Sequence, residues 1–402
     1  MSNSCVPYSS CMDYDTHSLT PIGITNFRNS NKRFGIKDAD KLYHGLILGK
    51  TGCGKSTLIK NMVRSDMEKG KNCAVIDPHG QLAEELLALV PEHRNNDLVY
   101  FNPASDTPLS FNPLHGVHPK YHHLAASGLI STFKNIFFDS WGPRMEYILR
   151  FTLLTLLEVP GATLLDIQPL LTDEDYRKQA LTYVRNTHTL NFWIIEYYSY
   201  TKSFRNEAIS PILNKMGIFL SSAPLRNVVG QKTRSFRMQQ VLDGKLFIAN
   251  LSKGAVGEDV CALLGGMLIS AMQLAALHRS AEPEHLRKPF YLYVDEISTF
   301  VNLSFVGMLS ECKKYKLGVF MAGQYLDQLH EKVRAAILGN IGTLISFRIG
   351  ATDAEYLAKE FYPVFSAEDF VHLPRYAMYI RLMIDGATSE GFSANAIPNV
   401  KL

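Results

Sequence analysis

The amino-acid sequence predicts an α/β protein in which a mostly parallel sheet, with helices on both faces, is interrupted by an all-helical domain. Short apolar runs alternate with helical stretches as far as residue 119, and this alternation is typical of a parallel sheet. From about residue 120 to 225, apolar residues recur at three- and four-residue steps, which indicates helices. Strand-like runs then resume, so the helices form an insertion.

The length of the chain allows several structural units. Its 402 residues, 46% of them hydrophobic, suffice for a large core and for roughly two to three domain-sized units. We expect a polar N-terminal segment, then a sheet domain in two parts with the helical insertion between them. In that chain order, the four segments are 1–40, 41–119 (first part of the sheet domain), 120–228 (insertion) and 229–402 (second part).

The expected strands are short apolar runs between polar or turn-forming residues. Residues 1–40 are polar and turn-rich with little periodicity, and we assign no strand to them. The expected strands are GLILG (45–49), CAVID (73–77), LVYF (98–101), KLFIANL (245–251), FYLYVD (290–295), LGVFMAG (317–323), TLISFRI (343–349) and YAMYIRLMI (376–384).

Charge and cysteine usage exclude few functions. The net charge is +3, with 41 Lys and Arg against 38 Asp and Glu, so no strongly basic body indicates nucleic acid, although a local basic lining would suffice for it. The six cysteines are scattered without a Cys-x-x-Cys pair, which favours free thiols over a disulfide framework or a zinc site. The first fifteen residues lack the basic start and apolar stretch of a secretory signal.

One segment approaches the length and composition of a membrane span. Residues 260–277 are apolar apart from Ser270 and Gln273. Because the segment lies mid-chain between two strands expected in the same sheet, we interpret it as a buried helix of a soluble protein.

The stretch GKTGCGKS at 49–56 matches the pattern G-x-x-x-x-G-K-[ST] between an expected strand and an expected helix. In this context its glycines allow a tight turn whose N–H groups surround phosphate oxygens. Lys55 should neutralise the β- and γ-phosphates, and the Ser56 hydroxyl should bind Mg²⁺. The expected nucleotide-binding residues are Gly49, Lys50, Thr51, Gly52, Cys53, Gly54, Lys55, Ser56 and Thr57.

Polar residues follow two later expected strands. Asp295 ends the apolar run at 290–295, where a carboxylate can support Mg²⁺. The adjacent Glu296 can orient and deprotonate a water, as hydrolysis of ATP requires. Gln324 closes the run at 317–323 and is placed to contact the γ-phosphate or the water. These residues predict a hydrolytic site rather than a nucleotide sensor.

Taken together, these motifs resemble a known group of proteins. GKTGCGKST, VIDPHGQLAEELL, FNPL, YVDEI and LSECKKYKLGVFMAGQYLDQL follow one another in that order over most of residues 40–390. The set is similar to the HerA–FtsK group of motor ATPases, and most similar to the coupling-protein branch of type IV secretion.

The resemblance implies a RecA-like P-loop NTPase core with an extra strand between the phosphate and acidic motifs, and with a helical domain inserted in the core. It also implies a homohexameric ring that moves DNA through its centre by hydrolysing ATP with Mg²⁺. Membrane-anchored coupling proteins carry spanning helices before the phosphate loop, and none is visible here. We therefore expect a cytoplasmic motor, either free or recruited to the inner face of the membrane by a partner.

In the same group, an arginine before the glutamine strand reaches the ATP of the neighbouring subunit. Lys313 occupies that position here; it keeps the charge but lacks the planar bidentate fork. Either Lys313 has this catalytic role, or Arg348 or Arg226 replaces it.

Three further features have an ordinary structural interpretation beside a functional one. The histidines in LHGVHPKYHH, from His115 to His123, are more typical of solvated or packing residues than of a metal site. The basic stretch at 230–239 could follow a DNA backbone, although a solvated loop is the commoner case. The stretch from Asp77 to His79 ends a strand at the edge where such folds place functional groups.

These observations predict an ATP-driven DNA translocase acting in conjugation or related DNA transfer, with a secretion or relaxase partner. Two alternatives stay open. One is a HerA-type helicase-translocase that processes DNA ends beside a nuclease partner, and genome neighbours would separate it from the first. The other is a nucleotide-gated scaffold with little hydrolysis, against which Glu296 argues.

Overall fold

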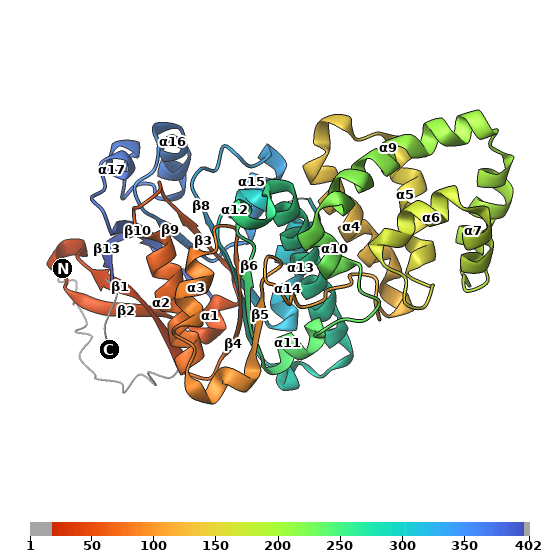
Figure 1. The fold of residues 1–402 in the computed structure, drawn as a ribbon. Helices are drawn as coiled ribbons and strands as arrows, with labels where there is room; N and C mark the ends of the chain where they lie inside the picture. The colour runs from red at the N-terminus through yellow and green to blue at the C-terminus, as the bar shows by residue number, and fades with distance from the viewer. Residues whose placement is uncertain (1–17, 302, 398–402) are drawn as a thin grey trace.

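A computed structural model describes residues 18–301 and 303–397 of the chain (Figure 1). Cys5, Cys11 and the N-terminal stretch considered for a signal lie outside these residues. The four cysteines within them are buried free thiols, namely Cys53, Cys73, Cys261 and Cys312.

The centre of the molecule is one sheet of eleven strands in the order β2-β1-β13-β10-β9-β3-β8-β7-β4-β6-β5. The strands from β9 to β5 run parallel, and the four at the other end are antiparallel. The bounds are β1 Leu19–Thr25, β2 Lys32–Lys37, β3 Gly45–Leu48, β4 Asn72–Asp77, β5 Leu98–Phe101, β6 Leu246–Asn250, β7 Phe290–Val294, β8 Leu317–Gly323, β9 Thr343–Ser346, β10 Ala377–Arg381 and β13 Phe392–Ala396. A separate pair joins β11 (Met383–Ile384) to β12 (Ala387–Thr388).

Helices cover both faces of this sheet. Every residue of β3, β6, β7 and β8 is buried, as expected of parallel strands with helices on both sides. Along β3, Leu46 and Leu48 join one hydrophobic cluster and Ile47 joins the other, because alternate side chains point to opposite faces. The predicted α/β fold, mostly parallel with helices on both faces, is therefore confirmed.

The helices of the two faces come from different parts of the chain. On one face lie α2 (Lys55–Glu68) and α3 (Gln81–Leu87), whose apolar residues belong to the cluster of Ile47. The other face carries α4 (His122–Ile136), α11 (Met238–Gly244), α13 (Glu258–His278), α14 (Leu303–Cys312) and α15 (Glu331–Asn340). The remaining α-helices outside the stretch between β5 and β6 are α1 (Asp38–Lys41), α12 (Lys253–Val256), α16 (Ala351–Glu360) and α17 (Ala367–Val371).

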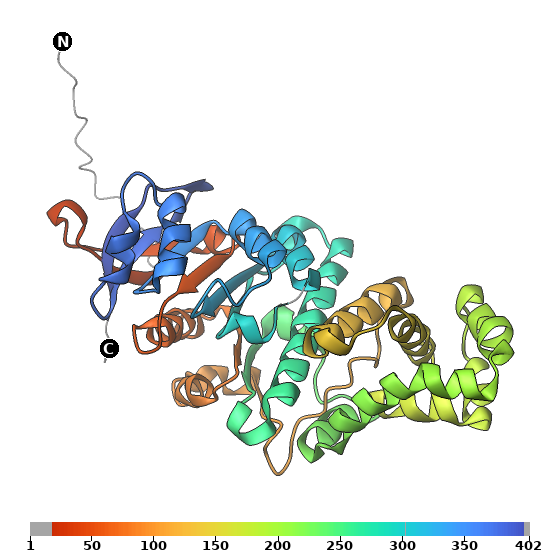
Figure 2. The same cartoon turned by 90° about the horizontal axis from the view of Figure 1, so that it is seen from above.

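Between β5 and β6 the described chain forms no strand and is helical over most of residues 119–244. After α4 come α5 (Pro143–Leu156), α6 (Ile167–Thr172), α7 (Glu174–Leu181), α8 (Thr187–Asn191), a π-helix (Phe192–Tyr197), α9 (Lys202–Ser221) and α10 (Ala223–Val229). Figure 2 shows α5 to α9 extending away from the sheet as a lobe. α4 packs on α13, and a Cβ on Gly266 would lie 2.6 Å from Thr132, so the glycine allows this close approach. The division into four segments stays a prediction.

The apolar segment at 260–277 lies within α13. By length and composition, residues 258–281 form the one helix among the described residues that could cross a membrane, and 72% of its apolar window is buried within the protein. Its neighbours on the sheet face include α4 and α11. The interpretation as a buried helix therefore agrees with the structure.

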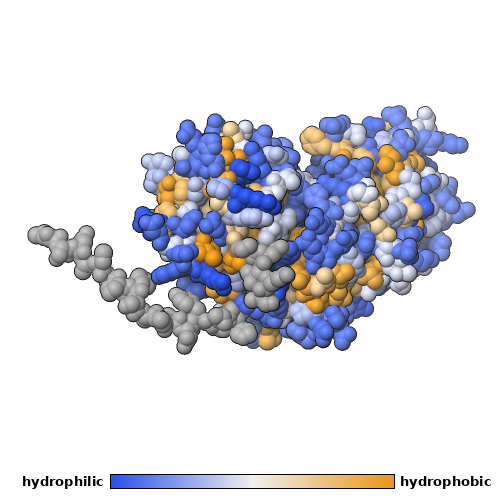
Figure 3. All heavy atoms as spheres, turned by 60° about the vertical axis from the view of Figure 1, so that its left-hand side comes forward, coloured by the Kyte–Doolittle hydropathy of each residue, from blue (hydrophilic) through white to orange (hydrophobic). Residues whose placement is uncertain are grey.

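Two strands occur in the N-terminal segment, where none is expected. β1 and β2 form from residues 19–37 and extend the main sheet, so the expectation of an N-terminal segment without strands is wrong there. Pro21 and Gly23 interrupt the apolar pattern of β1, and the pairing with β2 shifts register between them. A bulge of this kind accommodates proline and glycine in a strand, but it hides the strand from a periodicity argument. Figure 3 shows this end of the molecule covered mostly by hydrophilic residues, with small apolar areas between them.

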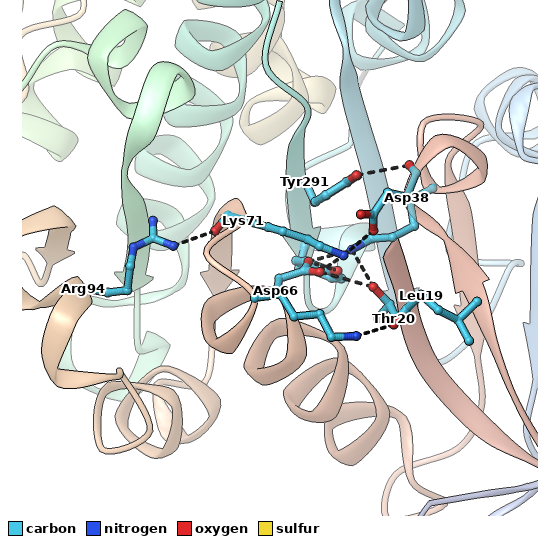
Figure 4. A network of polar contacts seen from close by, with 10 residues as sticks. Leu19, Thr20, Asp38, Asp66, Lys71, Arg94 and Tyr291 are labelled. Carbon is cyan, nitrogen blue, oxygen red and sulfur yellow. Dashed lines mark hydrogen bonds and ion pairs between the residues drawn. The ribbon is translucent and has the colours of Figure 1, made fainter. Parts of the chain in front are cut away.

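A buried ionic network joins α2 to β7, and Figure 4 labels its central carboxylate, Asp66, together with Thr20 on β1. The Lys41 ammonium donates to both carboxylate oxygens of Asp66, at 2.6 and 2.7 Å, and both side chains are fully buried. The Tyr293 hydroxyl donates to the same carboxylate at 2.7 Å, and Thr20 Oγ1 donates to it at 3.3 Å. One carboxylate on α2 thus joins α1, which ends at Lys41, to β7 and β1.

Candidate functional site: a nucleotide pocket at the carboxyl edge of the sheet

The phosphate-loop motif forms the turn between β3 and α2. Gly54 has a φ of 127°, which residues with a Cβ rarely adopt, and a Cβ on Gly49 would lie 2.5 Å from Cys53 Sγ. The loop therefore requires glycine at both positions. Lys55 begins α2, so the turn lies at the amino end of a fourteen-residue helix, where backbone N–H groups and the helix dipole favour an anion.

The Lys55 ammonium lies across this turn. It donates hydrogen bonds to the carbonyl oxygens of Gly49 and Lys50, the second at 3.2 Å. Although Lys55 is buried, its side chain lines the pocket beside the loop. The ammonium is therefore placed to contact a phosphate bound by the loop.

Ser56 and Asp295 bring two oxygen ligands together. Ser56 Oγ donates to Asp295 Oδ2 at 3.3 Å, and Asp295 follows the last residue of β7. Burial raises the pKa of the Asp295 carboxyl, and the nearby Asp77 carboxylate raises it further, while the Lys55 ammonium acts in the opposite direction. A divalent cation would relieve this repulsion, and Mg²⁺ prefers hydroxyl and carboxylate oxygens. These residues therefore fit the expected Mg²⁺.

Glu296 is fixed next to Asp295 by three hydrogen bonds. Its N–H donates to Asp295 Oδ1, and its carboxylate accepts from Ser298 Oγ and from Gln324 Nε2, all at 3.1 Å. The backbone of Glu296 is left-handed, with φ 49° and ψ 64°. Such a conformation costs a residue with a side chain about 1–3 kcal/mol and is found mainly at functional sites. The carboxylate is thus held in one orientation at the pocket.

Gln324 connects the acid to the phosphate loop. Its Oε1 accepts a hydrogen bond from Thr51 Oγ1 at 3.1 Å, while its Nε2 donates to Glu296. Gln324 can make both contacts because β8 lies between β3 and β7 in the sheet. This position of β8 is the extra strand that the resemblance implies, and the side chains of Thr51, Gln324 and Glu296 form one chain of hydrogen bonds across it.

The predicted residues line a single pocket of about 580 Å³. From the predicted set, Thr51, Gly52, Gly54, Lys55, Ser56, Thr57, Asp295, Glu296 and Gln324 are in its wall. Gly49, Lys50 and Cys53 are in the loop but outside the lining. The structure therefore brings the phosphate loop, the two acids and the glutamine together, although they are distant in sequence.

The pocket wall also contains residues that the sequence motifs do not indicate. Lys60 on α2 forms an ion pair with Glu85 on α3 at 2.8 Å. Arg375 and Tyr376, which precede β10, close the side of the pocket that faces β9. No local signal identifies Arg375 and Tyr376, because they reach the site only through the strand order.

The stretch from Asp77 to His79 also reaches the pocket. Asp77 is fully buried, and its carboxylate accepts from the N–H groups of His79 and Ala83 at 2.8 and 2.9 Å. Asp77 thus fixes the turn into α3, and its charge acts on Asp295. The exposed His79 side chain lines the pocket.

The three candidates for the trans-acting cation lie in different places. Lys313 precedes β8 at the edge opposite the pocket, and its ammonium lies 3.1 Å from the ring centre of Tyr43. Arg348 is exposed beside its own phosphate loop, where its carbonyl accepts from the N–H of Lys50. Arg226, on α10, donates to the carbonyls of Leu220 and Ser221. None of the three lines the pocket of its own chain.

The histidine-rich stretch makes local contacts. His118 accepts from the Lys120 N–H, and His122 Nε2 donates to the Val117 carbonyl. No group of three or more potential metal ligands occurs within residues 18–301 and 303–397. In the basic stretch at 230–239, the half-buried Phe236 stacks on the buried Phe111, which favours a packing role for its ring.

Comparison with known proteins places the chain in a family. The family model described as the central domain of helicase HerA matches residues 36–252, more than half of the chain. This chain belongs to the HerA family. Its expected membership of the HerA–FtsK group is thereby confirmed. A search of curated proteins finds no match to the sequence.

Solved structures support the fold of this HerA family member. The plasmid coupling protein TrwB, in complex with the non-hydrolysable GTP analogue GDPNP, superposes with a TM-score of 0.66 at 14% identity, over 90% of this chain and 87% of TrwB. A TrwB complex with ADP and Mg²⁺ gives the same TM-score. VirB4 of Thermoanaerobacter pseudethanolicus gives a TM-score of 0.61 at 14% identity, over 94% of this chain and 96% of VirB4. The RecA-like P-loop NTPase fold is confirmed.

Proposed function

We propose that this protein hydrolyses ATP in a homohexameric ring and uses the energy to move DNA, in conjugation or a related type IV secretion-like transfer. One observation carries the hydrolytic part: a phosphate loop, a Ser56–Asp295 pair and the fixed carboxylate of Glu296 line one pocket. Membership of the HerA family supports the DNA-moving part. The proposal places the ring in the cytoplasm, free or recruited to the inner face of the membrane by a partner.

The residues of the pocket have separate roles in the proposed hydrolysis. Lys55 and the N–H groups of the loop hold the phosphates and offset their charge. Glu296 accepts a proton from water as the water oxygen bonds to the γ-phosphorus and the bond from that phosphorus to the β–γ bridging oxygen breaks. Gln324 contacts the γ-phosphate or this water. Bound Mg²⁺ would add charge neutralisation, with Ser56 and Asp295 as its protein partners.

The variant Glu296→Gln tests the hydrolytic assignment. It keeps the size of the side chain and removes the proton acceptor, so we expect kcat to fall about 10²-fold or more, while the Kd for ATP measured by titration calorimetry stays within a few-fold of wild type. Glu355→Gln, an exposed acid on α16, is the matched control and should keep wild-type turnover. Wild-type turnover by Glu296→Gln would show that the base is wrongly assigned.

The DNA-moving part requires a separate measurement. Steady-state ATPase rates with and without duplex and single-stranded DNA should show stimulation, and native mass measurement should show hexamers. An ATPase rate that is unchanged by either form of DNA, together with a protein that stays monomeric, would overturn the translocase proposal. It would favour the nucleotide-gated scaffold instead.

A second function shares every residue of the pocket. The matching family model is named after helicase HerA, which favours a helicase-translocase acting beside a nuclease as the alternative. A nuclease gene next to the gene for this protein would support it, whereas neighbouring relaxase and secretion genes would support DNA transfer. Co-purification with the neighbour's product would decide between the two.

A further inference from the structure

Arg375 and Tyr376 lie on the side of the phosphate loop away from the acids. They precede β10, which pairs with β9, and β9 pairs with β3. Asp295 and Glu296 follow β7, which is separated from β3 by β8. The loop thus has the acidic strand on one side and the segment 375–376 on the other. Because the acids and Gln324 surround the γ-phosphate side, the nucleoside half of a bound nucleotide is left to extend toward the second side.

The segment 375–376 is tied directly to the phosphate loop. Arg375 Nε donates to the carbonyl of Gly52 at 3.1 Å, and the Tyr376 N–H donates to the carbonyl of Cys53 at 3.0 Å. The Tyr376 ring packs so closely that a Cβ on Gly54 would lie 2.9 Å from its Cδ1. These contacts hold both residues at a fixed position relative to the phosphate loop.

The backbone of Tyr376 is unusual for an aromatic residue. Its φ is 67°, in the left-handed region that large side chains rarely occupy and that is concentrated at ligand-binding and active sites. The strain turns Tyr376 toward the loop while its N–H and carbonyl stay paired, the carbonyl with the N–H of Ala396.

Together the two side chains present flat surfaces to the pocket. The Arg375 guanidinium lies 4.7 Å from the centre of the Tyr376 ring, and both residues line the pocket. Arg375 is exposed and Tyr376 is half-buried, so a planar group can still reach the guanidinium. Nucleobases bind such guanidinium and aromatic faces by stacking.

We propose that Arg375 and Tyr376 form the platform on which the base of the bound nucleotide stacks. This inference rests on the proposed nucleotide hydrolysis and names the residues that hold the nucleoside half. The platform offers faces rather than hydrogen-bonding groups aimed at a base edge, so ATP and GTP bind with similar affinity. CTP binds more weakly, because a pyrimidine has a smaller face to stack.

Inorganic tripolyphosphate carries the phosphates of ATP without the nucleoside, so comparing the two ligands isolates the contribution of the nucleoside half to binding. Calorimetry with Mg²⁺ compares ATP, GTP, CTP and inorganic tripolyphosphate on the full chain and on Arg375→Ala, Arg375→Lys and Tyr376→Leu. The expected result is an ATP Kd about tenfold higher in all three variants and an unchanged tripolyphosphate Kd. Arg375→Lys is the critical variant, because it keeps the charge and removes the plane. Arg185→Ala, an exposed arginine on the helical lobe, is the control and should match wild type.

The outcomes distinguish this inference from the proposed function. Equal weakening of ATP and tripolyphosphate in Arg375→Ala, with recovery in Arg375→Lys, would overturn the platform and make Arg375 a phosphate contact. Unchanged ATP affinity in every variant would overturn it as well. A wild-type protein that binds neither ATP nor tripolyphosphate would instead remove the proposed function itself.

Discussion

His44 shows how one buried side chain fixes the entry to the phosphate-loop strand. Its Nδ1 accepts from the Val319 N–H at 3.1 Å, so Nε2 carries the proton and donates to the Leu309 carbonyl at 2.8 Å. The neutral ring thereby joins β3, β8 and α14. Burial lowers the pKa of His44 to about 4, the Leu309 bond opposes this shift, and the charge of Lys313 adds to it.

This pKa predicts acid sensitivity with a definite sign. The unfolded chain protonates His44 near pH 6.5, whereas the folded chain keeps it neutral down to about pH 4, so the unfolded state takes up more protons between these values. Stability is therefore lost as pH falls from about 6.5 to 4, by up to about 3 kcal/mol. Thermal unfolding at pH 7 and pH 5 should show a larger drop in Tm for wild type than for His44→Gln. Equal drops would contradict the assignment.

The predicted site residues that line the pocket share a local signal. Lys55 and Ser56 belong to a contiguous motif, and Asp295 and Gln324 each end an apolar run. Arg375 lacks both kinds of signal, since its place beside Gly52 depends on β10 pairing with β9, which only the three-dimensional fold establishes. The hydrogen bonds of Gln324 to Thr51 and Glu296 are likewise visible only once β8 is placed between β3 and β7.

Among the elements, α2 and β7 are connected at two levels. At the carboxyl edge they carry Ser56 and Asp295, and below that edge Asp66 on α2 accepts from Tyr293 on β7. Burial lowers the pKa of Lys41, and the charge of Asp66 opposes that shift. The lower contact sets the position of the helix against the strand, and so supports the geometry of the upper one.

Replacing one partner of the buried Lys41–Asp66 pair should lower the free energy of unfolding far more than replacing both. Asp66→Asn leaves the Lys41 ammonium buried without a counter-charge, which typically costs about 3–5 kcal/mol. The double variant Asp66→Asn with Lys41→Met removes the charge as well and should recover much of that loss. The free energy of unfolding is measured by denaturant titration for the wild type, for each single variant and for the double variant. These four values give the coupling energy of the pair. A double variant as unstable as the sum of the singles would mean that the pair is not coupled.

At the level of elements, sequence patterns succeed where burial is uniform. β3, β6, β7 and β8 are continuous apolar runs because both of their faces are covered. β13 reads FSANA, with small and polar residues, and it becomes a strand through its pairing with β1 and β10. The expected run at 376–384 divides into β10 and β11, because Leu382 lies between the main sheet and the separate two-stranded sheet.

For the whole molecule, the direction of the parallel strands places the nucleotide pocket and Lys313 at opposite edges of the sheet. The parallel strands deliver their carboxyl ends to the nucleotide pocket, while Lys313 precedes β8 at the opposite edge. β8 has seven residues, which span about 20 Å at roughly 3.3 Å per residue. Lys313 is therefore too far along the strand to reach the pocket of its own chain, and it could contribute only to a neighbouring copy.

Complementation tests this trans assignment. Lys313→Ala and Glu296→Gln should each hydrolyse ATP slowly alone, whereas a mixture assembled together should regain activity. In mixed rings, an intact Lys313 from one variant faces an intact Glu296 from the other. Mixtures of Arg348→Ala or Arg226→Ala with Glu296→Gln are the matched comparisons. If only the Arg348→Ala mixture recovers, the trans-acting cation is Arg348 and not Lys313.

The distance along β8 also sets how the protein should respond to dilution. Under this proposal, a chain alone carries the nucleotide pocket but lacks the cation that a neighbour supplies. Bound ATP would then persist on dilute chains, and turnover per chain would rise steeply once the concentration allows assembly. The rate of ATP hydrolysis would thus rise more steeply than linearly with the protein concentration. Unassembled chains would then consume little ATP.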